Sequence, residues 1–183
     1  MTLEFAVDPE LTETLRAQIL ACWTEVSNAG GAVGFVPPVT TEDVRPDAER
    51  LYAAVESGQD RLIIGRETGA AAAGAADGGR LAAVATLSGH LFRLTDHWRT
   101  VKRVMVHPDF QGRGYGLSLM AEVERVARAM GLEMITLDLR GGTGNDAFYK
   151  KCGYVEFGRL PGALRLSADD YRDRIYMVLP LRE

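Results

Sequence analysis

The clearest chemical signal in the sequence is three glycines at alternate positions, Gly112, Gly114 and Gly116, within VHPDFQGRGYGLSLM. They follow an apolar run typical of a strand and precede an amphipathic run with helical spacing. Glycine costs backbone entropy and has no side chain to pack, so three of them need a reason. A helix N-terminus presents free N–H groups and the positive end of the helix dipole, and glycines let phosphate oxygens reach those amides. The pattern predicts a phosphate-binding turn.

The two common phosphate-binding motifs do not fit this turn. A P-loop requires Gly-Lys-Ser/Thr, whereas Gly116 is followed here by Leu117 and Ser118. A dinucleotide-binding fold has GxGxxG near an N-terminal strand, whereas this motif is GxGxG and lies late in the chain. Neither class of nucleotide site is therefore indicated.

Two residues further along the chain have the chemistry to move protons. Tyr149 lies in NDAFYKKCG, a short predicted helix, and a phenol with a reference pKa of about 10 is a proton donor at neutral pH. The alternative is a packing role, which the neighbouring Phe148 can supply instead. Asp138 stands inside the apolar run ITLDLR, where a carboxylate is out of place unless it faces a cleft. It is either a general base or an acceptor of structural hydrogen bonds.

Histidines and cysteines give no sign of a metal centre. His90, His97 and His107 do not cluster in the sequence, and His107 is expected at the surface, at the end of a strand. Cys22 and Cys152 provide neither a disulfide framework nor metal-ligand spacing. We expect no metal and no nucleophilic thiol.

The N-terminal third is predicted to hold one strand and two helices. Residues 3–7, LEFAV, are typical of a strand, and Asp8 followed by Pro9 predicts a helix with Asp8 as its N-cap. The glycine-rich segment 28–38 ends that helix in a loop, and a second helix is expected at about 46–57.

The rest of the chain alternates between strands and helices around one central strand–helix–strand unit. The helix after the glycines should end at Gly131, a natural residue for the position after a helix. The Ala/Gly-rich stretch 68–80 is expected to be a hairpin loop. Together these segments predict a mixed α/β domain. Strands are expected at 61–67, 80–91, 100–108, 133–140, 154–160 and 174–181.

Composition places the chain among ordinary globular proteins. Its 183 residues are 46% hydrophobic and 25% charged, and we expect one domain, residues 1–183. The formal net charge of −4 argues against a nucleic-acid-binding surface, which is usually basic. The N-terminus lacks the pattern of a signal peptide, and no apolar run has membrane-spanning length. A cytoplasmic protein without a membrane partner is therefore expected.

Two motifs in order resemble those of one family. Gln111-Gly112-Arg113-Gly114-Tyr115-Gly116 matches Q/R-x-x-G-x-G/A, and it follows a V-x-V-x-P strand that ends at Pro108. Downstream, AFYKKCGYVEFG is similar to the second signature, a helix with an aromatic-Tyr pair that ends in Gly-Tyr. The chain thereby resembles the GNAT superfamily of acetyl-CoA-dependent N-acetyltransferases. The stretches GGAVGF, VMVHP, LDLRGG and GRLPGA extend the similarity to bacterial acetyltransferases related to tabtoxin resistance protein.

The resemblance implies a fold and a cofactor site. The expected fold is a mostly antiparallel sheet of about seven strands with splayed parallel strands, flanked by about four helices. Acetyl-CoA would enter between the strands at 101–106 and 134–139. Its pantetheine would bind the main chain of Val104, Met105 and Val106. Its pyrophosphate would bind the amides of the turn, formed by Gln111, Gly112, Arg113, Gly114, Tyr115, Gly116 and Leu117.

The resemblance also implies catalytic residues. Tyr149 aligns with the family's tyrosine acid, which protonates the departing thiolate, and Asp138 matches an acidic residue of the tabtoxin-resistance relatives. Those relatives carry a glutamate where this chain has Thr100, so a mechanism with two carboxylates is not indicated. The family places a loop over the acceptor site, where Phe35 would form one wall; the alternative is a plain connector.

Further cofactor contacts follow less directly from the family pattern. Its asparagine before the tyrosine is replaced here by Gly142, and Asn145 takes the place of the alanine, from where it could contact the cofactor. Arg113 and Lys151 could reach cofactor phosphates, or remain solvated surface charges.

The resemblance implies a small primary amine as acceptor, such as an amino-acid-like toxin or antibiotic, acetylated by direct attack in a ternary complex. The alternatives are a protein or peptide acceptor and a non-catalytic acyl-CoA sensor. Asp138 and the mildly acidic chain predict a pocket that attracts a cation. The segment 160–173 is expected to cover the cleft, and the apolar stretch 174–181 to form an exposed edge strand that supports a homodimer.

Overall fold

The computed structural model describes residues 2–68 and 79–182 of the chain. This part contains seven strands and four α-helices, which confirms the predicted α/β fold class. The predicted Ala/Gly-rich loop lies mostly in 69–78, outside the described residues. The strands are β1 (Thr2–Val7), β2 (Asp60–Thr68), β3 (Arg80–Ser88), β4 (Trp98–Val106), β5 (Met134–Arg140), β6 (Val155–Arg165) and β7 (Tyr171–Pro180). The helices are α1 (Glu13–Asn28), α2 (Thr41–Glu56), α3 (Tyr115–Ala129) and α4 (Asn145–Lys151).

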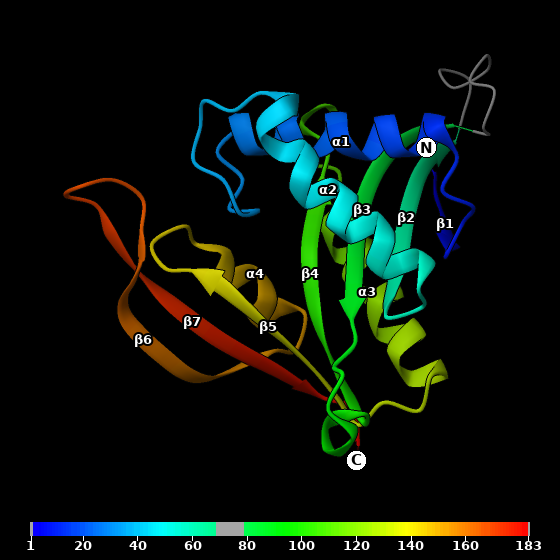
Figure 1. Cartoon of the computed structure of the whole chain (residues 1–183). Helices are drawn as coiled ribbons and strands as arrows, with labels where there is room; N and C mark the ends of the chain where they lie inside the picture. Colours follow the sequence, from blue (N-terminus) through cyan, green and yellow to red (C-terminus); the bar gives the residue numbers. More distant parts are fainter. Residues whose placement is uncertain (1, 69–78, 183) are drawn as a thin grey trace.

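All seven strands form one sheet in the order β1-β2-β3-β4-β5-β7-β6. Neighbouring strands run antiparallel except β4 and β5, which are parallel and joined through α3. Figure 1 shows α1 and α2 crossing one face of the sheet, with α3 behind it. Each face thereby has its own helical cover, and the predicted phosphate-binding turn lies at the junction of β4 and α3.

Two apolar cores occupy the two faces of the sheet. One packs α1 and α2 onto β2 to β4 around Trp23, which is fully buried and donates its indole N–H to the Val33 carbonyl at 2.9 Å. The other packs α3 onto the opposite face and onto β5 and β7. β3 runs through the middle, and its residues from Leu81 to Ser88 are all buried. A strand that is covered on both faces has a nearly continuous apolar sequence, and β3 does.

The parallel pairing of β4 with β5 is short. Only Trp98, Arg99 and Thr100 of β4 are in register with β5, opposite Met134, Ile135 and Thr136. Beyond Thr100 the two strands separate, while β5 stays paired with β7 along its whole length. Figure 1 shows β5, β6 and β7 leaning away from the rest of the sheet. The predicted splay is therefore present, and it leaves one side of 101–106 without a strand partner.

The first helix begins later than predicted. Its N-cap is Thr12, whose side chain accepts a hydrogen bond from the N–H of Leu15 at 3.2 Å. Asp8 is instead a turn residue with a left-handed φ of 49°, and its carboxylate accepts from the N–H of Leu62 at 2.8 Å and pairs with Arg61. Aspartate is used in turns for the same reason that it caps helices, namely its short acceptor side chain, and this ambiguity made the prediction wrong.

The second helix begins earlier than predicted, at Thr41. Thr40 and Asp43 form a capping box: the Thr40 hydroxyl accepts from the Asp43 N–H, and the Asp43 carboxylate accepts from the Thr40 N–H at 2.8 Å. Pro46 lies within this helix, one turn after its start. Pro46 lies beyond the first-turn N–H groups that need no intrahelical partner, so it costs the helix one hydrogen bond, to the carbonyl of Glu42.

The C-terminal strands differ from the sequence-based expectation. Residues 174–181 were expected at an exposed edge, but β7 lies between β5 and β6, so that prediction is wrong. The apolar character of β7 comes from residues such as Ile175 and Met177, which are buried in the core under α3. The edge strand is β6, most of whose residues are exposed. The segment 160–173 is not a separate excursion, because β6 and β7 extend into it as a long hairpin.

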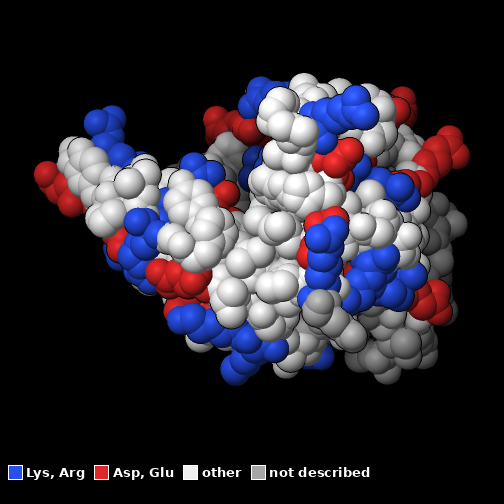
Figure 2. Space-filling model, turned by 90° about the horizontal axis from the view of Figure 1, so that it is seen from below, with Lys and Arg blue, Asp and Glu red and all other residues white. Residues whose placement is uncertain are grey.

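The described surface carries charges of both signs. Figure 2 shows Lys and Arg side chains interspersed with Asp and Glu on the face seen there, with the β6–β7 hairpin projecting to one side. None of the described helices is both long and apolar enough to cross a membrane.

Candidate active site

Two adjoining cavities lie along the splayed edge of β4. The larger, about 700 Å³, lies between the α1–α2 loop, β4, β5 and the β6–β7 hairpin. The smaller, about 580 Å³, lies at the N-terminus of α3. Val104, Val106 and Tyr149 line both, so the cavities meet beside the splayed strand. We call them the acceptor cavity and the turn cavity.

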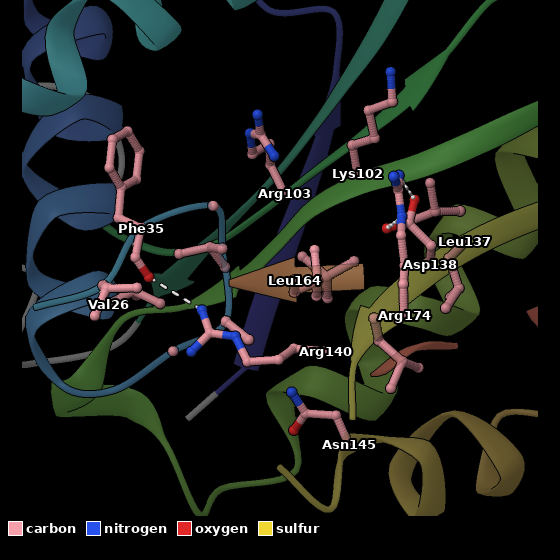
Figure 3. Close-up of a pocket in the computed structure, with 18 of the residues that line it drawn as sticks. Val26, Phe35, Lys102, Arg103, Leu137, Asp138, Arg140, Asn145, Leu164 and Arg174 are labelled. Atoms are coloured by element: carbon pink, nitrogen blue, oxygen red, sulfur yellow. Dashed lines mark hydrogen bonds and ion pairs between the residues drawn. The ribbon is translucent and has the colours of Figure 1, made fainter. Parts of the chain in front are cut away.

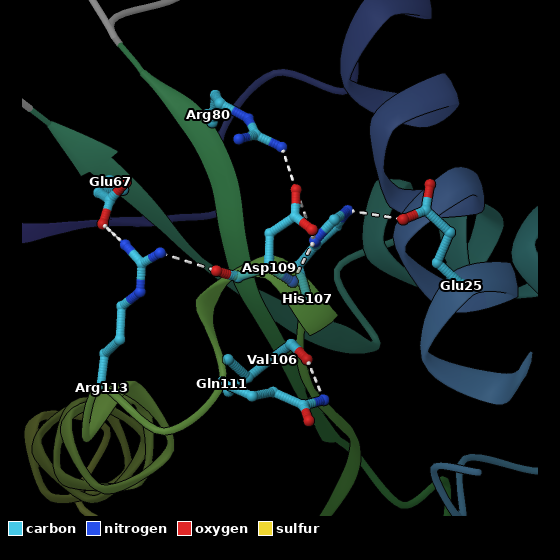
Figure 4. A network of polar contacts seen from close by, with 8 residues as sticks. All are labelled: Glu25, Glu67, Arg80, Val106, His107, Asp109, Gln111 and Arg113. Carbon is cyan, nitrogen blue, oxygen red and sulfur yellow. Dashed lines mark hydrogen bonds and ion pairs between the residues drawn. The ribbon is translucent and has the colours of Figure 1, made fainter. Parts of the chain in front are cut away.

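Polar contacts fasten the segment that leads from β4 to α3 (Figure 4). The His107 ring accepts from the N–H of Asp109 at 3.2 Å and contacts the Glu25 carboxylate of α1 at 2.9 Å. Asp109 in turn accepts from Arg80 at 2.7 Å, and the Gln111 amide donates to the Val106 carbonyl at 3.0 Å. His107 was expected at the surface, but its side chain is only 14% exposed. Its contacts with Asp109 and Glu25 hold the turn in place.

The three glycines have different structural reasons. Gly112 and Gly114 have left-handed φ angles of 75° and 80°, which glycine adopts without strain. A Cβ at either would meet nothing within 4 Å, so the space before them is open. A Cβ on Gly116 would lie 3.3 Å from the Phe148 ring of α4, so this glycine lets the two helices approach. In the first turn of α3 the Leu117 N–H donates to the Gly114 carbonyl at 3.0 Å, and the main chain of Tyr115 and Gly116 before it faces the turn cavity, as a phosphate site requires.

Side chains within the motif point elsewhere. The Arg113 guanidinium donates to the Glu67 carboxylate at 2.8 Å and to the Asp109 carbonyl at 2.9 Å, and it does not line either cavity. The Tyr115 hydroxyl also donates to Glu67 at 2.8 Å, and this hydrogen bond raises the pKa of the phenol. Glu67 of β2 is buried. Arg113 and Tyr115 therefore anchor the turn to the sheet, and what they offer a ligand is their main chain.

Residues 101–104 of β4 all line the acceptor cavity, and at its C-terminal end the strand presents alternate residues to both cavities. Val104 and Val106 line both, whereas Met105 between them is 1% exposed and packs in the core under α1. The register with β3 shifts between Val84 and Thr86, opposite Arg103 and Val104. This bulge bends β4 where it separates from β5.

Tyr149 stands at the junction of the two cavities. It lies on α4, and its ring packs edge-on against Phe148 and Tyr154, with centroids 5.0 and 5.8 Å away. Burial raises the pKa of its phenol well above the ordinary value, so the group is protonated at neutral pH. Nearby Cys152 also has its pKa raised by burial, which disfavours a reactive thiolate.

Asp138 lines the acceptor cavity in an ion pair. Its two carboxylate oxygens accept from Nε and Nη2 of Arg174 on β7, at 2.8 and 2.9 Å (Figure 3). The bidentate hydrogen bonds raise the pKa of the Arg174 guanidinium. The pocket was expected to attract a cation because the Asp138 carboxylate would be unpaired. That premise is wrong, because Arg174 pairs with both oxygens of the carboxylate.

Some of the remaining predicted site residues line a cavity and others do not. Phe35 and Asn145 line the acceptor cavity, and Leu117 lines the turn cavity. Thr100 lines neither: its hydroxyl lies 3.1 Å from that of Thr136, at the last paired position of β4 and β5. Lys151 is exposed and lines neither cavity.

Sequence reasoning missed the basic residues of the acceptor cavity. Arg103 and Arg140 lie on β4 and β5, and Arg174 lies on β7. The only sequence signal was arginine or lysine inside otherwise apolar strand segments, as in TVKRVMV. Such residues usually belong to a solvated strand face, and only the splay makes them line a cavity.

Comparison with known proteins agrees with this geometry. Residues 38–154 match the model of the acetyltransferase (GNAT) family. An acetyltransferase candidate from Salmonella typhimurium, yncA, solved with its cofactor acetyl-CoA, is 18% identical with a TM-score of 0.74, over 100% of this chain and 95% of that one. A candidate phosphinothricin N-acetyltransferase is 17% identical with a TM-score of 0.75, over 100% of both chains. The ribosomal-protein-S18-alanine N-acetyltransferase from Escherichia coli is 18% identical with a TM-score of 0.68, over 100% and 96%.

These identities are too low to transfer an acceptor, and the structural likeness establishes the fold alone. The family match covers more than half of the chain, across the glycine turn and Tyr149. The chain belongs to the acetyltransferase (GNAT) family.

Proposed function

We propose that this protein, as one domain over residues 1–183, transfers the acetyl group of acetyl-CoA to a primary amine of a small molecule. The observation that carries the proposal is the meeting of the two cavities beside Tyr149. One cavity has the open amides that a cofactor phosphate needs, and the other has room for an acceptor. Both substrates would reach the same proton donor, as direct attack in a ternary complex requires.

The residues present fit acetyl-CoA. The turn cavity would hold the pyrophosphate at the amides of residues 112–117, where Gly112 and Gly114 leave open space. The unpaired side of 101–106 would hold the pantetheine through main-chain hydrogen bonds, because β5 pairs with β4 only up to Thr100. Asn145 lines both cavities and could contact the cofactor between them. Lys151 is still proposed to contact a cofactor phosphate, but its exposed side chain would have to move to reach it.

When bound, acetyl-CoA supplies an acetyl thioester whose carbonyl carbon the amine attacks, with release of the coenzyme A thiolate. Tyr149 would protonate that thiolate, since burial keeps its phenol protonated until an anion forms beside it. Asp138 is the proposed base, although both its oxygens hold hydrogen bonds from Arg174. An amine that enters already neutral would need no base.

A small acceptor is favoured over a peptide by the shape of the acceptor cavity. The β6–β7 hairpin supplies one wall through Ala163, Leu164 and Arg165, and Phe35 supplies another. A peptide needs an open groove, whereas these walls stand on either side of the splay. An amino-acid-like toxin or antibiotic, acetylated in the cytoplasm, is the proposed acceptor. A non-catalytic sensor is disfavoured because it would not need the phenol of Tyr149 at the junction of the cavities.

The proposal predicts release of free coenzyme A from acetyl-CoA in the presence of some small primary amines. The measurement is a thiol assay with amino acids, polyamines, aminoglycosides, amino-acid-like toxins and short peptides. We expect turnover with at least one small amine and none with peptides. Turnover with peptides alone would assign a protein acceptor, and binding of acetyl-CoA without any turnover would assign a sensor.

The Gly114→Val variant should weaken acetyl-CoA binding. The left-handed φ of 80° strains any residue with a Cβ, and the valine side chain would enter the space proposed for phosphate. We expect the dissociation constant, measured by calorimetry, to rise tenfold or more, about 1.4 kcal/mol. Gly131→Val is the matched control, because Gly131 has a φ of 73° and open space at the other end of α3. Equal affinity in both folded variants would contradict the phosphate site.

The Tyr149→Phe variant should retain the fold and lose turnover. It keeps the ring that packs against Phe148 and Tyr154 and removes only the hydroxyl. We expect kcat to fall roughly a hundredfold, with acetyl-CoA affinity unchanged. Tyr154→Phe is the control, since its buried hydroxyl has no hydrogen-bond partner among the described residues. Full activity of Tyr149→Phe would mean that another group or water protonates the thiolate.

The Asp138→Asn variant tests the proposed base. The amide keeps the side-chain volume but cannot take a proton from the amine. We expect turnover to fall roughly a hundredfold across the accessible pH range. Activity within about twofold of wild type at every pH would leave Asp138 only as the partner of Arg174.

We also propose a homodimer, formed through the edge strand β6. Val155, Phe157 and Leu160 of this strand are each more than half exposed, and an apolar edge favours pairing. Light scattering should give about 40 kDa, twice the 19.9 kDa of the chain, and Phe157→Glu should shift the mass toward the monomer. A mass near 20 kDa for the wild type over a wide concentration range would contradict the dimer.

A further inference from the structure

The acceptor cavity is strongly basic, although the chain as a whole is acidic. Among the described residues, Asp138 is the only carboxylate that lines it. A cavity walled by low-dielectric protein concentrates the field of the charges that line it, so this excess of positive charge acts on whatever enters. The cationic lining residues are Lys102, Arg103, Arg140, Arg165 and Arg174.

Three arginines of the cavity, Arg174, Arg140 and Arg103, differ in their hydrogen-bond and ion-pair partners. Arg174 is held by both oxygens of Asp138. Arg140 donates one hydrogen bond, from Nη2 to the carbonyl of Phe35 at 3.1 Å, and keeps its charge. Arg103 has no hydrogen bond or ion pair with any described residue; its guanidinium lies over the ring of Trp23, 4.6 Å from the ring centroid. Of these three arginines, Arg103 and Arg140 therefore form no ion pair with a described carboxylate.

The charge of Arg103 is also partly removed from water. Burial is the main cause that lowers the pKa of this guanidinium, and the carboxylates that act against it are Asp47 and Asp138. Asp47 is paired with Arg50 at 2.9 Å and Asp138 with Arg174, so neither is available to Arg103. Taking a charge out of water without a hydrogen-bonded partner is unfavourable. An anion bound in the cavity would supply the missing partner.

The backbone of Arg103 is strained in this position. Its φ of 54° lies in the left-handed region, which a residue with a long side chain rarely adopts. It occupies the bulge of β4, where the register with β3 shifts. A bulge redirects a side chain, and backbone strain of this kind is concentrated at functional sites.

Arg103 and Arg140 approach neighbouring residues of one loop. A Cβ on Gly34 would lie 3.7 Å from Nη1 of Arg103, and the carbonyl of Phe35 accepts from Arg140. In Figure 3 the two arginines come from β4 and β5, the strands that separate here, and Arg140 points to the loop that carries Phe35. Gly34 and Phe35 are neighbours in the chain, so an oxyanion beside this loop would lie in the field of both guanidinium groups.

We infer that the acceptor of this enzyme carries an anionic group, a carboxylate or a phosphonate, in addition to its amine, and that Arg103 with Arg140 binds that group. The inference rests on the proposed function and adds to its amino-acid-like acceptor a required anionic group and the residues that bind it. It also replaces the expectation of a pocket that attracts a cation, which five cationic side chains would repel.

Matched pairs of ligands test this inference by binding and by turnover. One pair is L-leucine and L-leucinamide, and the other is 3-aminopropylphosphonate and n-propylamine. We expect wild-type protein saturated with coenzyme A to bind the anionic member of at least one pair tenfold or more tighter, measured by calorimetry. With acetyl-CoA, the same member should have the higher kcat/KM. Leucinamide loses its amine proton more readily than leucine. A larger fraction of its amine is therefore neutral, and this effect alone would favour turnover of the amide.

Arg103 variants locate the site. Arg103→Gln should reduce the preference for the anionic member to within about threefold, mainly through Kd and KM, and Arg103→Lys should restore part of it. Arg125→Gln is the control: it removes one charge from the exposed face of α3, where Arg125 pairs only with Glu122. Its preference should equal that of the wild type.

The outcomes separate this inference from the proposed function. Equal binding of both members by the wild type, or an unchanged preference in Arg103→Gln, would overturn the inference even if acetyl transfer occurs. Selective binding of the anionic member that is lost in Arg103→Gln would support the inference even if no acetyl transfer is detected, in which case the proposed function fails alone.

Discussion

The site depends on the incomplete pairing of β4 with β5. A parallel strand pair normally continues for the length of both strands, but here it ends at Thr100 and Thr136. From that point β5 stays with β7 and β4 stays with β3, so the sheet divides into two parts that share one short seam. The main chain of 101–106 then lacks a partner on one side, which backbone groups avoid unless a ligand or water satisfies them. Both cavities, and the access of Tyr149 to both, follow from this division.

A divided sheet needs other contacts to keep its two parts in a fixed relation. The segment after β4 is bound to α1 through His107 and Glu25 and to β3 through Arg80 and Asp109. On the other side, Arg140 of β5 holds the carbonyl of Phe35, and Asp138 holds Arg174. These bonds involve side chains around the cavities and leave the amides of the glycine turn and the phenol of Tyr149 free of them. Rigid surroundings and available reactive groups are what a preorganised site requires.

The sequence predicts the glycine turn with its flanking strand and helix because these segments are local. The glycine turn, the strand before it and the helix after it lie within about thirty residues, and left-handed backbone permits few residues other than glycine. Helix starts were less certain, since Asp8 fits both a helix cap and a turn, and α2 begins at Thr41 instead of near residue 46. The acceptor end was not predictable from composition or spacing. Phe35 and Arg140 stand 105 positions apart, and Asp138 and Arg174 stand 36 apart, so only the folded sheet brings them together.

The position of β7 inside the sheet has a consequence for the order of assembly. β5 and β6 are both made before β7, yet each has β7 as its antiparallel partner. During synthesis on the ribosome, the part of the sheet from β1 to β4 can pair and cover its faces with α1, α2 and α3 while β5 has only its short seam with β4. The glycine turn between β4 and α3 can therefore form early, whereas the basic wall of the acceptor cavity is completed only when the β7 segment, which carries Arg174, emerges and inserts. Until then β5 and β6 present open edges, which makes this the stage of biogenesis at which a chaperone has the most to protect.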